Sequence, residues 1–399
     1  MLAGTRMNQL REDFSFTAAI AGLLAVIVSF AGSAVIIFQA AHVAGLSEEL
    51  TSSWIWAVSI GSGVTGVFLC WRTKIPVITA WSTPGAALLV VMLPGVPFAE
   101  AVGAYLASAV IVIAIGLTGT LDMIMRRIPG AVCSGMFAGI LFSFGARVFT
   151  SIEVEPPLAL SMIGCFILFR KLSPRYSVAA VMAVGIIVSA LMGLLQFDSL
   201  RLSVAVPVFT APAWSGAAVL GIGLPLALVT LTGQYISGMA VLHASGYPVR
   251  SNGIMAVTGL ASLLLAPFGA HAINLSSLTA AICTGKEAHE NPARRYVAGL
   301  CCGGLYILFG LFGMTITSLF ASLPAIFIAV LAGLALVGAF TSGLAGMFAD
   351  RENLESGVIA FLATASGMAF LGLGAPFWGL ALGTLSFFAL KAGQVPPRA

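Results

Sequence analysis

The amino-acid sequence predicts an all-α integral membrane protein with fourteen transmembrane segments, arranged as two inverted repeats of seven spans. Three observations lead to this prediction. The chain is strongly apolar, its basic residues fall at alternate ends of the apolar segments, and its two halves contain similar motifs in the same order. A chain with these properties crosses the bilayer many times and leaves few residues for a soluble domain.

The composition is that of a membrane protein. Of the 399 residues, 59% are hydrophobic and 8% are charged, and the mean hydropathy is +1.07. Soluble domains carry about 25% charged residues, so this chain is expected to lie largely in lipid. Residues 1–15 are polar and charged and lack the apolar core of a signal peptide, so the first apolar run is expected to remain as an anchor.

The charge and the cysteines indicate no additional partner. Basic residues that record orientation account for the net charge of +4, so no nucleic-acid partner is expected. The six cysteines and four histidines show no CxxC pair and no metal-ligand spacing, so no metal or cofactor is predicted. The sequence also lacks a P-loop, an HExxH motif and a Ser/His/Asp arrangement, which argues against direct use of ATP and against an enzyme.

A helix needs about 20 apolar residues to cross the hydrocarbon of a bilayer. Charged residues, prolines and polar clusters divide the chain into fourteen segments: 16–42, 53–70, 76–93, 98–122, 130–149, 157–169, 177–196, 216–241, 252–267, 272–284, 296–316, 322–340, 355–371 and 375–391. With both termini in the cytoplasm, all of the 18 lysines and arginines except Arg147 and Arg201 fall on the cytoplasmic side. This distribution follows the positive-inside rule and supports the count.

The two halves, 1–204 and 205–399, contain matching motifs at an almost constant separation. Gln39 matches Gln234, 195 positions later, and VTG at 64–66 recurs at 257–259. STPGAAL at 82–88 matches SSLTAAI at 276–282, and the proline of RIPG matches that of SLPA. Because each half would hold an odd number of spans, the second half enters the bilayer from the opposite side. Inverted repeats of this kind occur in many secondary transporters.

Spans three and ten are short and polar, and we interpret each as an extended segment followed by a half-helix that begins near mid-membrane. In span three, residues 77–81 are mostly β-branched or aromatic, which favours extended backbone. Ser82 and Thr83 then precede Pro84, as a helix cap precedes the proline that is favoured in a first helical turn. The N–H groups near Ser82 to Gly85 would therefore begin a helix inside the bilayer.

In span ten, residues 271–275 would be the extended part, with Ser276 or Ser277 as the cap. Two helix N-termini, each with unpaired N–H groups and about half a positive charge, would approach each other and bind an anion without a buried Lys or Arg. Asn274 would add a side-chain contact. The alternative is that these polar residues only form hydrogen bonds across packed helices.

Gln39 and Gln234 are the other polar residues at membrane depth. Either could be a clamp between helices, but their equivalent positions around the broken spans favour a binding role for Gln234 and its neighbour Tyr235. Phe38, Trp81 and Tyr235 would supply aromatic walls suited to a ring, with ordinary aromatic packing as the alternative. No carboxylate lies in the centre of a span, so no residue stands out as a proton carrier.

Three motifs carry a resemblance to a known family: VITAWSTPGAALL at 77–89, LTGQYISGMAVL at 231–242 and PFGAHAINLSSLTAAICTG at 267–285. Over its whole length the chain resembles the bacterial benzoate/proton symporter family (BenE type) and, more broadly, the nucleobase/ascorbate and sulfate carriers. The resemblance implies a core domain in two parts, 1–127 and 205–316, and a gate domain in two parts, 128–204 and 317–399. It also implies the bacterial inner membrane and is compatible with a homodimer through the gate domain.

The chain departs from the nucleobase carriers in spans eight and ten. Where those carriers have a Glu in span eight this chain has Gln234, and where they have a further Glu it has only Ser and Thr. A carboxylate suits the N–H donors of a nucleobase but would repel benzoate. The resemblance therefore implies a secondary transporter that imports benzoate, or a close aromatic monocarboxylate, with protons by alternating access. A nucleobase or other organic-anion carrier and an anion channel on the same scaffold are the alternatives.

Overall fold

The computed structural model describes residues 12–120, 129–195, 202–276, 278–286, 288–371 and 373–392, and most of them are helical. The α-helices of the first half are α2 (Phe16–Ser29), α3 (Val35–Val43), α4 (Glu48–Thr73), α5 (Thr83–Met92), α6 (Phe98–Thr118), α8 (Gly130–Val154), α9 (Pro156–Leu172) and α10 (Ser177–Leu191). Those of the second half are α11 (Gly216–Ala218), α12 (Leu224–Thr230), α13 (Ser237–Ala244), α14 (Ser251–Leu265), α15 (Leu278–Thr284), α16 (Tyr296–Leu311), α17 (Gly313–Ala321), α18 (Ala325–Ala349), α19 (Leu354–Ala365) and α20 (Ala375–Ala392).

Shorter elements interrupt or join these helices. The π-turns η1 (Phe30–Ala34), η4 (Val219–Gly223) and η5 (Leu231–Ile236) lie within the segments predicted as spans one and eight. The 3-10 turns are η2 (Pro174–Tyr176), η6 (Ala266–Phe268), η7 (Pro292–Arg294) and η8 (Arg351–Asn353). The strands form two antiparallel pairs, β1 (Thr79–Trp81) with β2 (Ile273–Leu275) and β3 (Ala369–Phe370) with β4 (Leu373–Gly374).

The protein is a helical multi-pass membrane protein. In the described part of the chain, seven helices are long and apolar enough to cross a bilayer, or eight if Pro292–Leu311 and Gly313–Ala321, bent by 68°, count as one span. The other predicted spans coincide with shorter helices or, for spans three and ten, with a strand followed by a short helix. The count of fourteen crossings therefore stays a prediction.

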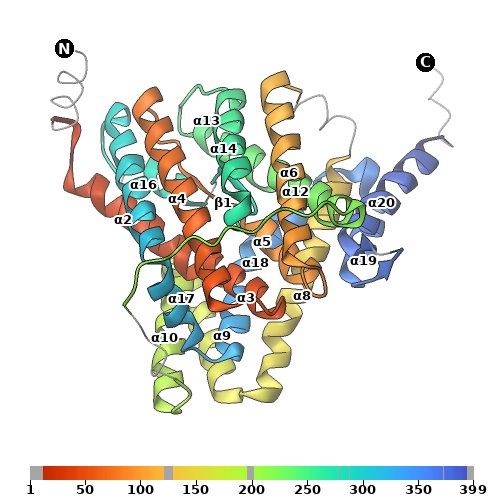
Figure 1. Cartoon of the computed structure of the whole chain (residues 1–399), viewed down its shortest axis with the longest axis horizontal. Coiled ribbons are helices and arrows are strands. Elements are labelled where there is room, and N and C mark those ends of the chain that lie inside the picture. The colour runs from red at the N-terminus through yellow and green to blue at the C-terminus, as the bar shows by residue number, and fades with distance from the viewer. Residues whose placement is uncertain are drawn as a thin grey trace.

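The helices pack in two groups that each combine elements from both halves of the chain. One group contains α2, α4 and α6 together with α12, α14 and α16, and β1 lies within it near the middle of the molecule (Figure 1). The other contains α8, α9 and α10 together with α18, α19 and α20. The groups meet where α3 contacts α18, α5 contacts α8 and α12 contacts α20.

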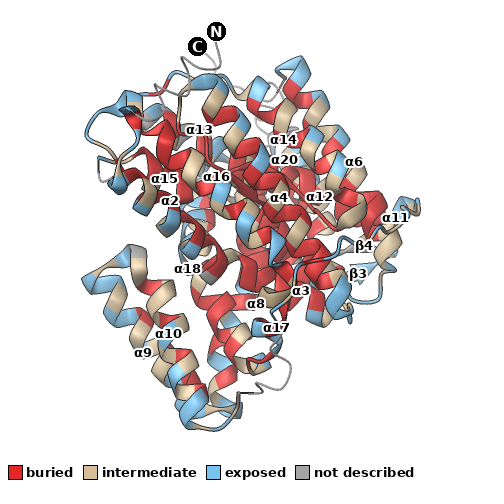
Figure 2. Cartoon of the chain, turned by 60° about the vertical axis from the view of Figure 1, so that its left-hand side comes forward, coloured by how far each residue is buried: buried red, intermediate tan, exposed pale blue. Residues whose placement is uncertain are grey.

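Buried residues are concentrated in the centre, around α3, α4, α8 and α16, whereas α9 and α10 project from it and consist mainly of intermediate and exposed residues (Figure 2). The exposed residues of α9 and α10 include apolar side chains such as Leu160, Ile167 and Leu191. Such side chains are expected on a helix surface that faces lipid. The two strands β1 and β2, by contrast, are buried over their whole length.

Glycines let α4 and α16 approach closely beside β1. A Cβ atom on Gly63 would lie 2.6 Å from the Gly303 carbonyl oxygen, and one on Gly303 would lie 2.8 Å from the Gly63 carbonyl oxygen. Both obstructing atoms belong to backbone, which cannot rotate away. Without a hydrophobic driving force between helices in lipid, such close backbone contact is a main source of helix association.

We therefore expect Gly303→Ala to destabilise the protein by about 1–3 kcal/mol, the usual range for overpacking. Gly304→Ala is the matched control, because a Cβ atom at Gly304 meets no heavy atom within 4 Å. Thermal unfolding of the purified variants in detergent measures the difference. Equal unfolding midpoints for the two variants would contradict the proposed contact.

Candidate functional site

The centre of the candidate site is the pairing of β1 with β2. Thr79 lies opposite Leu275, Ala80 opposite Asn274 and Trp81 opposite Ile273. The ladder continues at both ends, because the Ser82 N–H donates to the Ala272 carbonyl (3.0 Å) and the Ser276 N–H donates to the Ile78 carbonyl (2.9 Å). Extended backbone cannot remain unpaired inside a bilayer. The two segments, nearly 200 positions apart in sequence, therefore satisfy each other.

Helix α4 supports the two strands from one side. The Thr79 hydroxyl donates to the Ser62 carbonyl (2.6 Å) and accepts from the Thr65 hydroxyl (3.1 Å). A Cβ atom at Gly66 would lie 2.9 Å from Thr79 Oγ1, and one at Gly61 would lie 2.1 Å from the Ile273 side chain. The small residues of α4 thus make room for both strands.

Ser82 joins β1 to α5 and is the N-cap of that helix, as the sequence predicted. Its Oγ accepts the Gly85 N–H (3.0 Å) and the Thr230 hydroxyl (2.9 Å). Pro84, in the first turn, has no N–H to satisfy. A Cβ atom on Gly85 would lie 2.6 Å from Leu226 Cδ1 and 2.8 Å from Ser82 Oγ, so glycine is required there for the cap to form.

His271 fixes the position of this junction. Trp54 Nε1 donates to His271 Nδ1 (3.0 Å), so the ring hydrogen lies on Nε2, which donates to the Ser82 carbonyl (3.0 Å). The neutral ring is thereby held in one tautomer. His271 is buried and connects α4 to the start of α5. This arrangement agrees with a structural role.

The junction of β2 with α15 is described in part. Ser277 lies outside the described residues, and α15 begins at Leu278 and has seven residues. Ser276 is buried, and its Oγ accepts the Thr279 hydroxyl at 2.6 Å. Asn274 is also buried. When its amide is oriented so that both atoms face complementary groups, the nitrogen donates to the Leu275 carbonyl (3.2 Å) and the oxygen accepts from the Ser82 N–H (3.1 Å).

The strand register separates the starts of the two helices. Ser82 lies opposite Ala272 and Ser276 lies opposite Ile78, four positions along the same strand. At a rise of about 3.3 Å per residue, the two starts are about 13 Å apart along the ladder. One carboxylate can therefore contact one start and not both, in contrast to the meeting of two N-termini that the sequence suggested.

The junction of β1 with α5 has more hydrogen-bond donors than acceptors. The Trp81 Nε1–H is buried without a partner among the described residues. Ser82 Oγ already accepts two hydrogen bonds, so its own hydrogen is free to donate. The half-buried Thr83 follows directly. Fewer backbone N–H groups are free than predicted, because the Ser82 and Gly85 N–H groups are bonded.

Gln234 lies beside this junction on η5. A Cβ atom on the preceding residue, Gly233, would lie 3.1 Å from Pro84 Cγ, which places η5 against the first turn of α5. Gln234 is buried, and no described residue forms a hydrogen bond with its amide. Isolated π-turns within helices frequently occur at functional sites. Thr230, one turn before Gln234, contacts Ser82 and was not singled out by the sequence analysis.

Other predicted site residues have neighbours elsewhere. The Tyr235 hydroxyl bonds the Thr258 hydroxyl at 2.6 Å and faces the Ile273 carbonyl at 3.5 Å. Phe38 stacks on Phe320 of α17, with ring centroids 4.2 Å apart. The Phe38 contact is the aromatic packing given above as the alternative, whereas Tyr235 is held by hydrogen bonds to neighbouring segments.

The side chains of Trp81 and Gln39 lie in two different surroundings. Trp81 packs edge-on against Phe30 and Tyr306, with centroids 5.4 and 5.5 Å apart. Gln39 lines a separate cavity of ≈ 280 Å³ with the far end of α5. A cavity of ≈ 10 Å³ beside Thr230 and His271 is too small for an aromatic ring.

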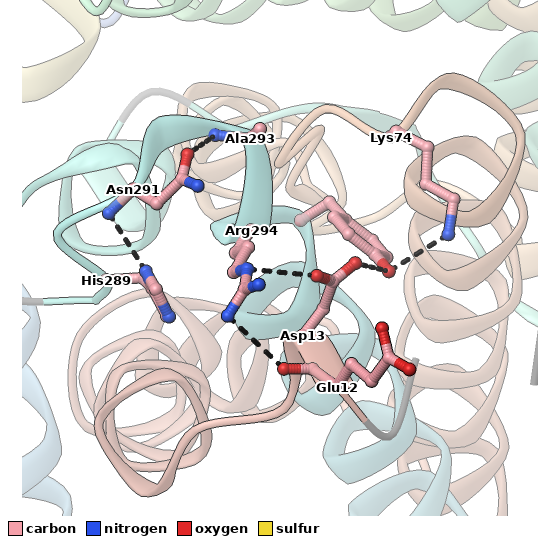
Figure 3. Close-up of polar contacts among 8 residues, drawn as sticks. Glu12, Asp13, Lys74, His289, Asn291, Ala293 and Arg294 are labelled. Carbon is pink, nitrogen blue, oxygen red and sulfur yellow. Dashed lines mark hydrogen bonds and ion pairs between the residues drawn. The ribbon is translucent and has the colours of Figure 1, made fainter. Parts of the chain in front are cut away.

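A second polar cluster lies at the predicted cytoplasmic face (Figure 3). Asp13 forms an ion pair with Arg294 (3.1 Å) and accepts the Tyr296 hydroxyl (2.9 Å), which in turn accepts from Lys74 (2.9 Å). Lys74 caps α4 with left-handed backbone (φ 57°). The cluster ties the segment before α2 to α4 and α16 and includes a buried carboxylate that the sequence analysis did not single out.

Solved structures with the same fold are transporters. The transmembrane domain of the cyanobacterial bicarbonate transporter BicA superimposes with a TM-score of 0.62 at 16% identity, covering 94% of this chain and 98% of that one. SLC26A9 superimposes with a TM-score of 0.63 at 14% identity, covering 95% of this chain and 66% of that one. At this identity the likeness establishes the fold alone. The chain therefore shares its fold with these two membrane proteins.

Sequence relatives identify the family. The model of the benzoate membrane transport protein family matches residues 12–389. A benzoate membrane transport protein of Acinetobacter baylyi is 44% identical over 97% of this chain and 98% of its own length. The inner membrane protein YdcO of Escherichia coli is 38% identical over 93% of this chain and 95% of its own length. The chain belongs to the benzoate membrane transport protein family, as its motifs indicated, and is a membrane transport protein and not an enzyme.

The contact of Trp54 with His271 leads to a stability prediction. Trp54→Phe keeps an aromatic ring but removes the donor that fixes the His271 tautomer, so we expect a loss of about 0.5–1.5 kcal/mol. Trp56→Phe, two residues along the same helix, is the control, since the Trp56 ring packs on Phe268 instead. Chemical denaturation of both variants measures the difference. A loss in Trp56→Phe as large as that in Trp54→Phe would argue against the bridge.

Proposed function

We propose that the protein is a secondary active transporter that imports benzoate, or a close aromatic monocarboxylate, together with protons by alternating access. Membership of the benzoate membrane transport protein family supports the substrate class. The observation that carries the proposal is the excess of buried donors where β1 meets α5. The donors are the Ser82 hydroxyl, on the side of Thr230, and the Trp81 indole N–H, which lies by Phe30 and Tyr306. Gln234 follows Thr230 by one helical turn.

The chemistry of this junction favours an anion over a nucleobase. Among the described residues, Asp13 and Arg295 are the only buried charged residues, and neither contacts β1 or η5. A carboxylate offers acceptors only, which match the unpaired donors. A nucleobase also brings N–H donors, which would need an acceptor such as a buried carboxylate. The α5 start adds a favourable dipole for a negative charge.

The same proposal assigns roles to the residues that the sequence singled out. The carboxylate binds at the start of α5, Ser82 to Gly85, where the Ser82 hydroxyl donates to it because the Gly85 N–H is bonded within the cap. Thr83 adjoins it, Gln234 is the side-chain contact, and Trp81 is donor and aromatic wall. Asn274, Ser276 and Ser277 form the equivalent region of span ten, toward which the ring extends. Tyr235, Phe38 and Gln39 complete the walls of the pathway.

For the architecture we propose fourteen spans in two inverted repeats, with spans three and ten broken. The core domain comprises 1–127 and 205–316, and the gate domain comprises 128–204 and 317–399. The separate packing of the two helix groups supports this division. We place the protein in the bacterial inner membrane with both termini in the cytoplasm, and assign homodimer formation to the gate domain. No described buried carboxylate adjoins the strands, so the proton carrier is not a carboxylate at this junction.

Ligand binding tests the substrate directly. We expect benzoate to raise the thermal unfolding midpoint of the purified protein, because a ligand that binds only the folded state stabilises it. Uracil is the control, since it is a single small ring without a carboxylate. Stabilisation by uracil without stabilisation by benzoate would overturn the substrate assignment.

The role of Gln234 is tested by transport. A hydrogen bond to a charged group contributes about 1.5–3 kcal/mol, so Gln234→Ala is expected to raise the half-saturating benzoate concentration by about 10-fold to 100-fold at normal abundance. Thr232→Ala is the control on the same turn, because its hydroxyl donates to the Leu228 carbonyl within the helix. Unchanged uptake in Gln234→Ala would assign that side chain to packing.

Counterflow distinguishes a carrier from the alternative of an anion channel. Vesicles preloaded with unlabelled benzoate should accelerate the uptake of labelled benzoate, because a carrier returns faster when loaded. A channel would show no such stimulation and would pass large anion currents. The second outcome would exclude alternating access.

A further inference from the structure

The cavity of ≈ 280 Å³ at the far end of α5 lies between the two helix groups. One wall is formed by α3 and by the end of α5 with the residue Pro94 that follows it. The other is formed by α8, α19 and the first turn of α20. Its volume is just below the usual range for organic-ligand pockets, about 300–1,000 Å³, and is adequate for a single ring.

The cavity has one positive charge. The exposed Arg147 of α8 lines it, and none of the described residues forms an ion pair or hydrogen bond with its guanidinium. It is also one of the two basic residues that the predicted topology places away from the cytoplasm. The positive-inside rule therefore does not account for Arg147. An unpaired guanidinium beside an apolar cavity is suited to a carboxylate, which it binds in a bidentate manner.

The opposite wall supplies an unpaired amide. Gln39 of α3 is more than nine-tenths buried and lines the same cavity, and its Oε1 has no hydrogen-bond partner among the described residues. An unsatisfied buried amide oxygen is costly, which favours a water or another donor bonded to it, while the Nε2–H₂ group of the same amide can donate to an anion. The remaining surface includes the apolar side chains Val90, Ile140 and Phe144, against which an aromatic ring can lie.

We propose that this cavity is a second carboxylate-binding site, in which Arg147 binds the carboxylate of an aromatic monocarboxylate on the non-cytoplasmic side. Gln39, in the opposite wall, can donate to the bound carboxylate through its Nε2–H₂ group, and the ring packs on α5 and α8. The proposal rests on the proposed transport of benzoate and adds a site separate from the junction of β1 with α5. The two sites share α5, one at its start and one at its end.

Cysteine protection locates the site without measuring transport. Ser143 lines the cavity, so Ser143→Cys is expected to react with a membrane-impermeant thiol reagent and to react several-fold more slowly with benzoate present. Ser161→Cys on α9, outside the cavity, is the control, and the wild type gives the background from its own cysteines. If benzoate does not change the rate at which Ser143→Cys reacts with the thiol reagent, the second site is overturned.

The role of Arg147 is tested by uptake from outside. We expect Arg147→Gln to raise the half-saturating external benzoate concentration by about tenfold, as for the loss of a charged hydrogen bond, with Arg147→Lys intermediate. Arg170→Gln, which removes the same charge from α9, should leave the half-saturating benzoate concentration unchanged. Normal half-saturation in Arg147→Gln would remove Arg147 from the site. Absence of benzoate uptake in the wild type would instead overturn the proposed function.

Discussion

The hydrogen-bonded pairing of β1 with β2 is the constraint on which the centre of the protein depends. Each strand has only three residues, and inside a bilayer neither could exist without a partner for its N–H and C=O groups. Their pairing fixes where α5 and α15 begin. The glycines of α4 and the Trp54–His271 bridge then hold the pair in place. Much of the surrounding packing serves to keep extended backbone at this depth.

The paired strands also explain how a binding region can be polar without being charged. Because backbone groups satisfy each other along the ladder, the side chains at its ends remain available. Trp81 and Ser82 retain hydrogen-bond donors for which the described residues supply no acceptor. Fixed dipoles of this kind can stabilise a carboxylate while avoiding the cost of burying a Lys or Arg in lipid. The fold shared with BicA and SLC26A9 thus holds a set of neutral donors in this chain.

Local features of the site could be predicted from sequence, and long-range features could not. The Ser-Thr-Pro order identifies Ser82 as a helix cap, and the β-branched residues before it indicate extended backbone. The strand register depends on contacts between segments far apart in the chain, so the separation of the two helix starts was not foreseen. Tyr235 and Phe38 show the same limit, since their partners Thr258 and Phe320 are fixed by tertiary packing. The spacing of Thr230, one turn before Gln234, was a usable signal.

The scarcity of buried charge has an electrical consequence. The described part of the chain buries only Asp13 and Arg295 among its charged side chains, both away from the strands. In the proposed transport cycle, taken with one proton for each benzoate anion, the unloaded site moves no net charge and the loaded site adds none. A membrane potential of 100 mV changes the free energy of moving one elementary charge across the membrane by about 2.3 kcal/mol. It acts only on charge that moves. In such a cycle the membrane potential exerts no direct force, and the concentration gradients of the two solutes alone set the direction of flux.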